Sequence, residues 1–200
     1  QNFGERVKHW ITFNEPWVDA FAPEFMLGKP TREGMARATR ISHHYLVSHA
    51  KAVEAYRKLD QGGKIGITLN LSPAYPSTES TQNNEAVKRF DGYMNRWFLD
   101  PVLKGEYPED MLAFYREKLD APDIRQGDME LIKDNPSDFL GVNYYSRSIV
   151  KSSDQDSVLG LEVVEDRNES WATNGEVFPQ GLYELLIRLD RDYDHPLMYI

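Results

Sequence analysis

Four short runs of apolar residues recur along the chain, and each is apolar at successive positions rather than at alternate ones. They are HWITF from His9, KIGITLN from Lys64, DFLGVNYY from Asp138 and PLMYI, which ends at Ile200. Short runs that are apolar on both faces are typical of parallel strands covered on both sides of a sheet. The pattern therefore predicts about four parallel strands.

The stretches between these runs have helical periodicity. Apolar residues recur every three or four positions over 31–59 and over 83–99, which is the spacing of an amphipathic helix. Thr31 is a candidate N-cap, because its hydroxyl can accept a hydrogen bond from a free backbone N–H. Three shorter stretches predict further helices, at 107–119, 128–133 and 179–192. Strands and helices that alternate at this spacing predict βαβ units and an α/β fold.

The segment 151–176 interrupts this alternation. It is mostly polar, apart from the sequence LGLEVVE that begins at Leu159. Loops of this length within a compact domain are usually functional or disordered. We therefore expect a long loop insertion at 151–176, within a single domain that takes in residues 1–200.

Two architectures share this order of elements: an open doubly wound sheet and part of a (β/α)₈ barrel. An open sheet that binds nucleotides has glycines directly after a strand, where they cradle phosphate at a helix N-terminus. In this chain the glycines of QGGKIG precede a strand, and the strands are followed by NEPW, NLSP and NYY. Polar and aromatic groups at the carboxyl ends of strands are typical of barrel active sites. The pattern favours a partial barrel.

Composition narrows the function. The 200 residues, 40% of them hydrophobic, are enough for one domain, and a net charge of −9 argues against nucleic-acid binding. No apolar run approaches the ~20 residues that span a membrane. The chain has no cysteine, which excludes disulfides and zinc–thiolate sites and fits a reducing compartment. The first residues do not resemble a signal peptide, so we predict a cytoplasmic protein.

A cluster of histidines raises the question of a metal. His43, His44 and His49 fall on one predicted helix. Two histidines that share a metal from one helix face are spaced four apart, and no two of these three are. We therefore expect no metal site and no cofactor.

Five sequence blocks occur in order over nearly the whole chain: WITFNEPW, GITLNLSPAYP, DGYMNRWFLDPVLKGEYPEDM, DFLGVNYY and FPQGLYELLIRL. Together they resemble glycoside hydrolase family 1, the β-glucosidase family. The resemblance implies a (β/α)₈ barrel, of which this chain corresponds to the region from the fourth strand to the seventh. It also implies hydrolysis of terminal β-D-glucosidic bonds with retention of configuration.

Retaining glycosidases use two carboxylates about 5–5.5 Å apart. Glu15 resembles the acid/base residue of the family. The nucleophile of the family is a Glu in a Thr-Glu-Asn-Gly motif that would begin where this sequence ends, at Ile200. We therefore expect the chain to be inactive alone, either as a piece of a longer protein or as one half that needs the remainder of the barrel as a partner.

The resemblance assigns further residues to substrate binding. Asn14 resembles the residue that binds the sugar 2-hydroxyl, and Tyr145 resembles the tyrosine that contacts the nucleophile. Asn143 is expected close to the same place. Trp17 resembles an aromatic wall on the leaving-group side of the scissile bond, and Asn70 is a candidate for the same subsite.

Alternatives remain open at this point. The sequence does not distinguish glucose from a 6-phosphosugar, so the parent could be a 6-phospho-β-glucosidase. The chain could also be a non-catalytic half-barrel used for binding or assembly, which would keep Trp17 and lose nothing when Glu15 is changed to Gln. In either enzymatic reading the ligand is a small-molecule β-glucoside or an oligosaccharide.

Overall fold

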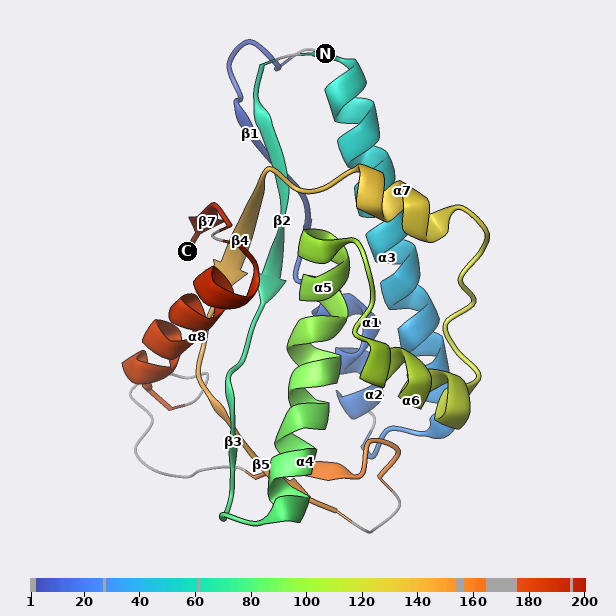
Figure 1. Ribbon diagram of the computed structural model, residues 1–200, viewed down its shortest axis with the longest axis vertical. Helices are drawn as coiled ribbons and strands as arrows, with labels where there is room; N and C mark the ends of the chain where they lie inside the picture. Colours follow the sequence, from blue (N-terminus) through green and yellow to red (C-terminus); the bar gives the residue numbers. More distant parts are fainter. Residues whose placement is uncertain (1–2, 27, 61, 154–156, 165–175, 195) are drawn as a thin grey trace.

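The central sheet has four parallel strands. The computed structural model describes residues 3–26, 28–60, 62–153, 157–164, 176–194 and 196–200. In spatial order the strands are β1 (His9–Asn14), β2 (Lys64–Asn70), β4 (Phe139–Asn143) and β7 (Met198–Tyr199), as Figure 1 shows. This order follows the chain without reversal, as in a (β/α)₈ barrel and unlike a doubly wound sheet, whose order reverses. The four predicted strands and the partial barrel are confirmed.

Helices connect these strands. The connection from β2 to β4 contains one continuous helical rod, in which a π-helical turn, η1 (Gly92–Arg96), joins α4 (Thr81–Asp91) to α5 (Trp97–Lys104). The prediction of a helix over 83–99 is confirmed, although the rod extends further at both ends. The remaining helices are α1 (Pro16–Ala20), α2 (Ala22–Met26), α3 (Arg32–Lys58), α6 (Glu109–Leu119), α7 (Asp128–Asp134) and α8 (Pro179–Asp192).

The predicted start of α3 is confirmed. The hydroxyl of Thr31 accepts a hydrogen bond of 3.0 Å from the backbone N–H of Gly34. This bond satisfies one of the N–H groups that a helix leaves free in its first turn. The short helices α1 and α2 were not predicted, because each is only five residues long and shows no periodicity.

A second, smaller sheet extends beyond the carboxyl ends of the main strands. It consists of β3 (Ala74–Pro76), β5 (Ser148–Ser152) and β6 (Leu161–Val164), with β5 parallel to β3 and antiparallel to β6. The expectation of one long loop over 151–176 is therefore wrong in part: the segment begins in β5 and contains β6. The ladder between β5 and β6 orders these residues, and residues 165–175 lie outside the described ones.

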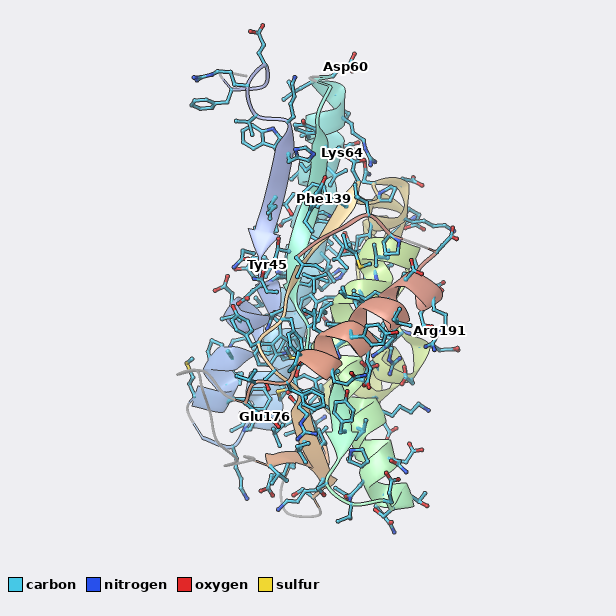
Figure 2. All side chains as sticks on the ribbon, turned by 90° about the vertical axis from the view of Figure 1, so that its left-hand side faces the viewer. Tyr45, Asp60, Lys64, Phe139, Glu176 and Arg191 are labelled. Atoms are coloured by element: carbon cyan, nitrogen blue, oxygen red, sulfur yellow. The ribbon has the colours of Figure 1, made fainter. Side chains whose placement is uncertain are left out.

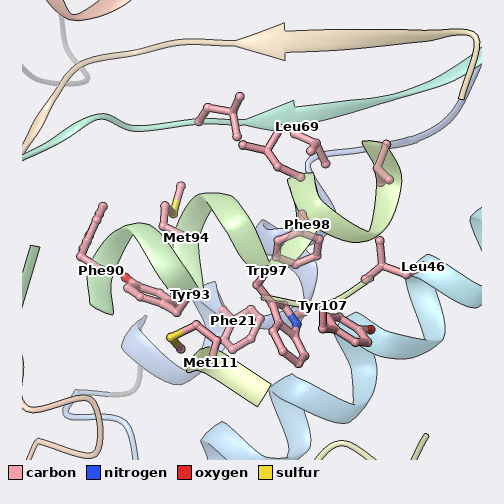
Figure 3. Close-up of a cluster of buried hydrophobic side chains, with 14 of the residues drawn as sticks. Phe21, Leu46, Leu69, Phe90, Tyr93, Met94, Trp97, Phe98, Tyr107 and Met111 are labelled. Atoms are coloured by element: carbon pink, nitrogen blue, oxygen red, sulfur yellow. The ribbon is translucent and has the colours of Figure 1, made fainter. Parts of the chain in front are cut away.

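Aromatic side chains fill the space between the sheet and the helices. Trp97 is fully buried; its ring stacks on Tyr107 at 4.1 Å, and its indole N–H donates to the Ser42 hydroxyl at 2.7 Å. Phe21 and Phe98 pack edge to face beside it (Figure 3). Burial of each such side chain contributes about 1.5–3 kcal/mol. Within the described ranges, no helix is long and apolar enough to cross a membrane.

The face of the sheet away from this core is open. Ile11 in β1 is 54% exposed. A cavity of about 350 Å³ lies on this face, lined by His9, Ile11, Thr68, Phe139, Gly141, Asn143, Tyr199 and Ile200. In a complete barrel this face corresponds to the interior.

Candidate active site

The turn after β1 sets the position of the first carboxylate. Pro16 is the first residue of α1, a position that proline favours because its missing N–H is not needed there. Proline also disfavours the right-handed helical conformation of the residue before it, and Glu15 adopts the left-handed conformation, with φ 52° and ψ 56°. The Glu15 N–H donates to the carbonyl of Thr68 in β2 at 2.9 Å. The end of β1 is thereby attached to its neighbour strand.

The Glu15 carboxylate is held by one group at the end of β4 and one group just after it. The side-chain amide of Asn143 donates to Glu15 Oε1 at 2.7 Å, and the hydroxyl of Tyr145 donates to the same oxygen at 2.7 Å. The Asn143 amide also lies 3.1 Å from the Asn14 side-chain oxygen and donates to it. Hydrogen bonding to the Glu15 carboxylate raises the pKa of the Tyr145 hydroxyl above its ordinary value. Four of the six predicted site residues therefore form one cluster.

The other two predicted residues line a cavity beside this cluster. Trp17 and Asn70 both face a space of about 390 Å³, and Tyr145 lines it as well. The remaining lining residues are Phe25, Leu71, Ser72, Phe90, Tyr93, Met94, Ser146, Arg147, Ser148 and Val163. Aromatic faces suit the C–H faces of sugars and planar organic groups, so the space can hold a large apolar substituent next to the carboxylate.

Several lining residues were missed by sequence reasoning. Phe25 stacks on Trp17 and on Tyr93, with ring centroids at 6.1 and 6.0 Å, and Trp17 and Tyr93 also contact each other at 6.1 Å. In the sequence, Tyr93 and its neighbour Met94 look like ordinary core positions of an amphipathic helix. The signal that would identify them is the π-helical turn, and this turn is not visible in residue periodicity.

Arg147 was also missed. Its guanidinium makes two hydrogen bonds to the Glu176 carboxylate, at 2.7 and 2.9 Å, and lies 4.2 Å from the centroid of the Phe178 ring. In Figure 2, Glu176 lies at the opposite end of the sheet from Lys64, where β2 begins. The pair therefore ties the segment before α8 to the carboxyl ends of the strands, and its two members are 29 residues apart.

Of the helical histidines, His43 and His49 are buried in the protein interior, whereas His44 is exposed. His43 contacts the Tyr107 hydroxyl at 2.8 Å and the Asp128 carboxylate at 3.0 Å through its two ring nitrogens. Within the described residues, no group of three or more His, Cys, Asp or Glu side chains is arranged to hold a metal ion.

A parallel sheet in chain order, with a carboxylate, amides and an aromatic cavity at the carboxyl ends of its strands, defines part of a (β/α)₈-barrel enzyme. The family described as Glycosyl hydrolase family 1 matches residues 1–200. The chain belongs to this family, as its sequence blocks predicted.

Individual relatives agree with this assignment. Beta-glucosidase A of Acetivibrio thermocellus is 37% identical over 208 residues, which cover 100% of this chain and 45% of that protein. The 6-phospho-beta-glucosidase GmuD of Bacillus subtilis is 34% identical, over 96% of this chain and 43% of its own length. The chain thus spans less than half the length of these relatives.

A solved structure of a relative also resembles the chain. The beta-glucosidase from Thermotoga maritima in complex with deoxynojirimycin is 36% identical and superposes with a TM-score of 0.84. The match covers 100% of this chain and 44% of that structure. The region described here therefore has the fold of the corresponding part of a family 1 glycosidase.

Proposed function

We propose that the protein containing this chain hydrolyses terminal β-D-glucosidic bonds with retention of configuration. The observation that carries the proposal is the Glu15 carboxylate at the carboxyl end of β1, held by Asn143 and Tyr145 beside an aromatic cavity. The β-glucosidases among the relatives support the choice of reaction.

In this proposal Glu15 acts as the acid/base residue. Its carboxyl group protonates the glycosidic oxygen as the leaving group departs, and the resulting carboxylate later removes a proton from the attacking water. The Asn143 amide supports this cycle, because it holds Oε1 through a hydrogen bond and leaves Oε2 to face the substrate. Asn14 binds the sugar 2-hydroxyl, a contact that strengthens in the oxocarbenium-like transition state.

The second carboxylate of a retaining site belongs, by family resemblance, to the motif that follows the strand equivalent to β7. Tyr145 is proposed to orient it. The Tyr145 hydroxyl carries one proton, which forms a hydrogen bond to Glu15 in the structure. This proton can bond to only one carboxylate at a time. The hydrogen bond of this hydroxyl would then switch from one carboxylate to the other as their charges change during the cycle.

We further propose that the remainder of the barrel covers the open face of the sheet. Ile11, Tyr199 and Ile200 are 54%, 43% and 73% exposed and border the cavity on that face. Exposed apolar side chains gathered at one place mark a surface that another segment covers. The greater length of the relatives supports this assignment.

The cavity next to Tyr145 is proposed to bind the leaving group. Trp17, at the start of α1, and Asn70, at the end of β2, both line this cavity. The expected substrates are small aryl or alkyl β-glucosides and short oligosaccharides, whose non-reducing glucose lies at Glu15 and whose remaining part lies against Trp17.

The test uses the complete protein and its Glu15→Gln variant. Loss of the acid/base residue should lower kcat by roughly 10²–10⁴-fold for a poorly activated aryl β-glucoside. A dinitrophenyl β-glucoside needs no acid to leave, so its glycosyl-enzyme still forms, and azide should restore turnover and yield β-glucosyl azide. The matched control is Asp19→Asn, because Asp19 lies on α1 and bonds to Tyr45 instead of the cluster. It should leave both rates unchanged.

Three results would contradict the proposal. They are unchanged turnover in the Glu15→Gln variant, absence of azide rescue, and an α-configured first product in an NMR assay of the wild type. Binding of a β-glucoside without any hydrolysis by the wild-type protein would favour a binding module instead.

A 6-phosphosugar is the second candidate substrate, because GmuD is 34% identical to the chain. The glucoside and its 6-phosphate should be compared at equal concentration. We expect the unphosphorylated substrate to have the higher kcat/KM, and the reverse order would move the protein to the 6-phospho-β-glucosidases.

A further inference from the structure

Asn95 makes an unusual contact from the middle of the helical rod. It lies in η1 and is fully buried. Its side-chain oxygen accepts from the backbone N–H of Ser72 at 3.0 Å, and its side-chain amide donates to the Ser72 carbonyl at 2.9 Å. The amide therefore pairs with both backbone groups of one residue, as a neighbouring strand would.

The Asn95 side chain is itself fixed. Its amide donates a second hydrogen bond, of 2.8 Å, to the Asp91 carboxylate. Asp91 is bound by the guanidinium of Arg188 in α8, at 2.5 and 2.9 Å, and by Arg96 at 3.0 Å. A charged network that joins the rod to α8 thus fixes the Asn95 side chain through Asp91. The same side chain in turn holds the backbone of Ser72.

Ser72 belongs to the wall of the leaving-group cavity. It lines the cavity two residues after Asn70. Its hydroxyl contacts the Ser148 hydroxyl at 2.9 Å and donates to the Ser146 carbonyl at 3.3 Å. Ser72 therefore connects two lining segments, the one that leaves β2 and the one that precedes β5.

The π-helical turn couples Asn95 to another part of the cavity wall. Tyr93 and Met94, the two residues before Asn95, also line the cavity. A π-helical turn contains one residue more than an α-helical turn and is frequent at functional sites. Gly92 begins the turn, and a Cβ there would lie 2.6 Å from Met111 Cγ, so α6 closes against the turn. One turn of helix thus supplies two lining side chains and fixes a third residue, Ser72.

We propose that Asn95 is a positioning residue that sets the width of the leaving-group cavity and thereby selects the leaving group. This inference rests on the proposed glycosidase function. Asn95 does not touch the sugar or Glu15; it acts through Ser72. If its side chain is removed, the Ser72 N–H and carbonyl lose their partners and the wall shifts, whereas the cluster around Glu15 keeps its own hydrogen bonds.

The test compares two substrates in the complete protein. 4-Methylumbelliferyl β-glucoside has a bulky leaving group that occupies the cavity, and β-glucosyl fluoride has none. In the Asn95→Ala variant, kcat/KM for the bulky substrate should fall about tenfold, equivalent to about 1.4 kcal/mol, mainly through KM. The value for the fluoride should stay within about twofold, since the loss is confined to leaving-group binding.

Asn83→Ala is the matched control. Asn83 is another buried Asn of the same rod. Its side chain also bonds to backbone groups: it accepts from the Ser152 N–H at 2.9 Å and donates to the Thr78 carbonyl at 3.0 Å. It does not line the cavity. This variant should lose thermal stability as Asn95→Ala does, but should keep the wild-type ratio of the two kcat/KM values. Asn95→Ser, which replaces the amide with a shorter polar side chain, should give an intermediate ratio.

Amide hydrogen exchange provides a readout that does not depend on turnover. Exchange at the Ser72 amide should accelerate in Asn95→Ala and remain unchanged in Asn83→Ala. Equal losses for both substrates, or an unaltered Ser72 exchange rate, would overturn the assignment of Asn95. If the wild-type protein cleaves neither substrate, the glycosidase proposal itself fails, which is a different result from an equal loss in the variant.

Discussion

Protonation of His49 should make the stability of the protein fall at mildly acidic pH. His49 lies on α3, is 3% exposed, and contacts the Thr12 hydroxyl at 2.8 Å and the Ser137 hydroxyl at 2.9 Å. Burial, together with the positive charge of Arg57, lowers its pKa from 6.5 to about 4. The ring is therefore neutral in the folded protein near neutral pH.

The hydrogen bonds identify which ring nitrogen carries the proton. The Thr12 hydroxyl donates to the Gly66 carbonyl at 3.2 Å, so its oxygen accepts from the Nδ1–H of His49. Nε2 then accepts from the Ser137 hydroxyl. A second proton, on Nε2, would face this hydroxyl, which would have to turn its own proton away.

The magnitude follows from linkage. In the unfolded chain His49 takes up a proton near pH 6.5, and in the folded protein near pH 4. Between these values the unfolded state binds more protons, so the free energy of unfolding falls as the pH falls, and the contribution is complete above pH 6.5. The loss is about 2 kcal/mol at pH 5 and about 3 kcal/mol below pH 4, at about 1.36 kcal/mol per pKa unit.

Urea unfolding at pH 7.5 and pH 5.0 checks this expectation. Other groups titrate in the same range, and their contribution cancels when the wild type is compared with His49→Gln, whose side chain does not ionise. Between the two pH values the wild type should lose about 2 kcal/mol more than the variant. Equal losses in the two proteins, or an NMR titration of the His49 ring with a midpoint at 6 or above, would refute the reasoning.

Two further predictions concern the strands that carry the site. Titration of Tyr145 by NMR should give a lower pKa in Glu15→Gln than in the wild type, because the carboxylate is the main cause of the raised value; an identical pKa would mean that the hydrogen bond is absent in solution. Gly141→Ala should lower the free energy of unfolding by about 1–3 kcal/mol, since the new Cβ would overlap Thr68 Oγ1 and lie 2.9 Å from Thr68 Cβ. Thermal melts measure this loss, and the added change Thr68→Ala should recover part of it.

The sequence predicts the repeating part of the fold well, because periodicity reports burial. The helix expected at 179–192 has those bounds in the structure, with a proline at its start and buried leucines at Leu185 and Leu189. Prediction from local sequence fails where burial outweighs a residue's own preference. Proline normally ends a helix, which predicts that the rod stops before Pro101. The helix instead continues to Lys104, because Trp97 and its neighbours bury large side chains there.

The second sheet could not be predicted for a different reason. Its strand β3 has three residues, one of them Pro76, and three residues show no period. Its partner β5 lies more than seventy residues further along the chain. Only long-range pairing makes these segments strands, and a single sequence carries no signal for such pairing.

The candidate site was predictable as a group but not in its geometry. The resemblance to the family placed Asn14, Asn143 and Glu15 together, and their positions at the carboxyl ends of parallel strands, which meet at one edge, agree with that expectation. The bond between Tyr145 and Glu15, and the role of η1, depend on backbone conformations that residue identity does not reveal.

The left-handed backbone of Glu15 places stability and chemistry in opposition at this residue. Glycine adopts this conformation freely, whereas a residue with a Cβ pays about 1–2 kcal/mol for it. Selection for stability alone would therefore favour glycine at position 15 and remove the carboxylate. An engineering campaign that ranks variants only by melting temperature would tend to enrich the replacement of Glu15 by glycine. Such a campaign should therefore keep position 15 unchanged.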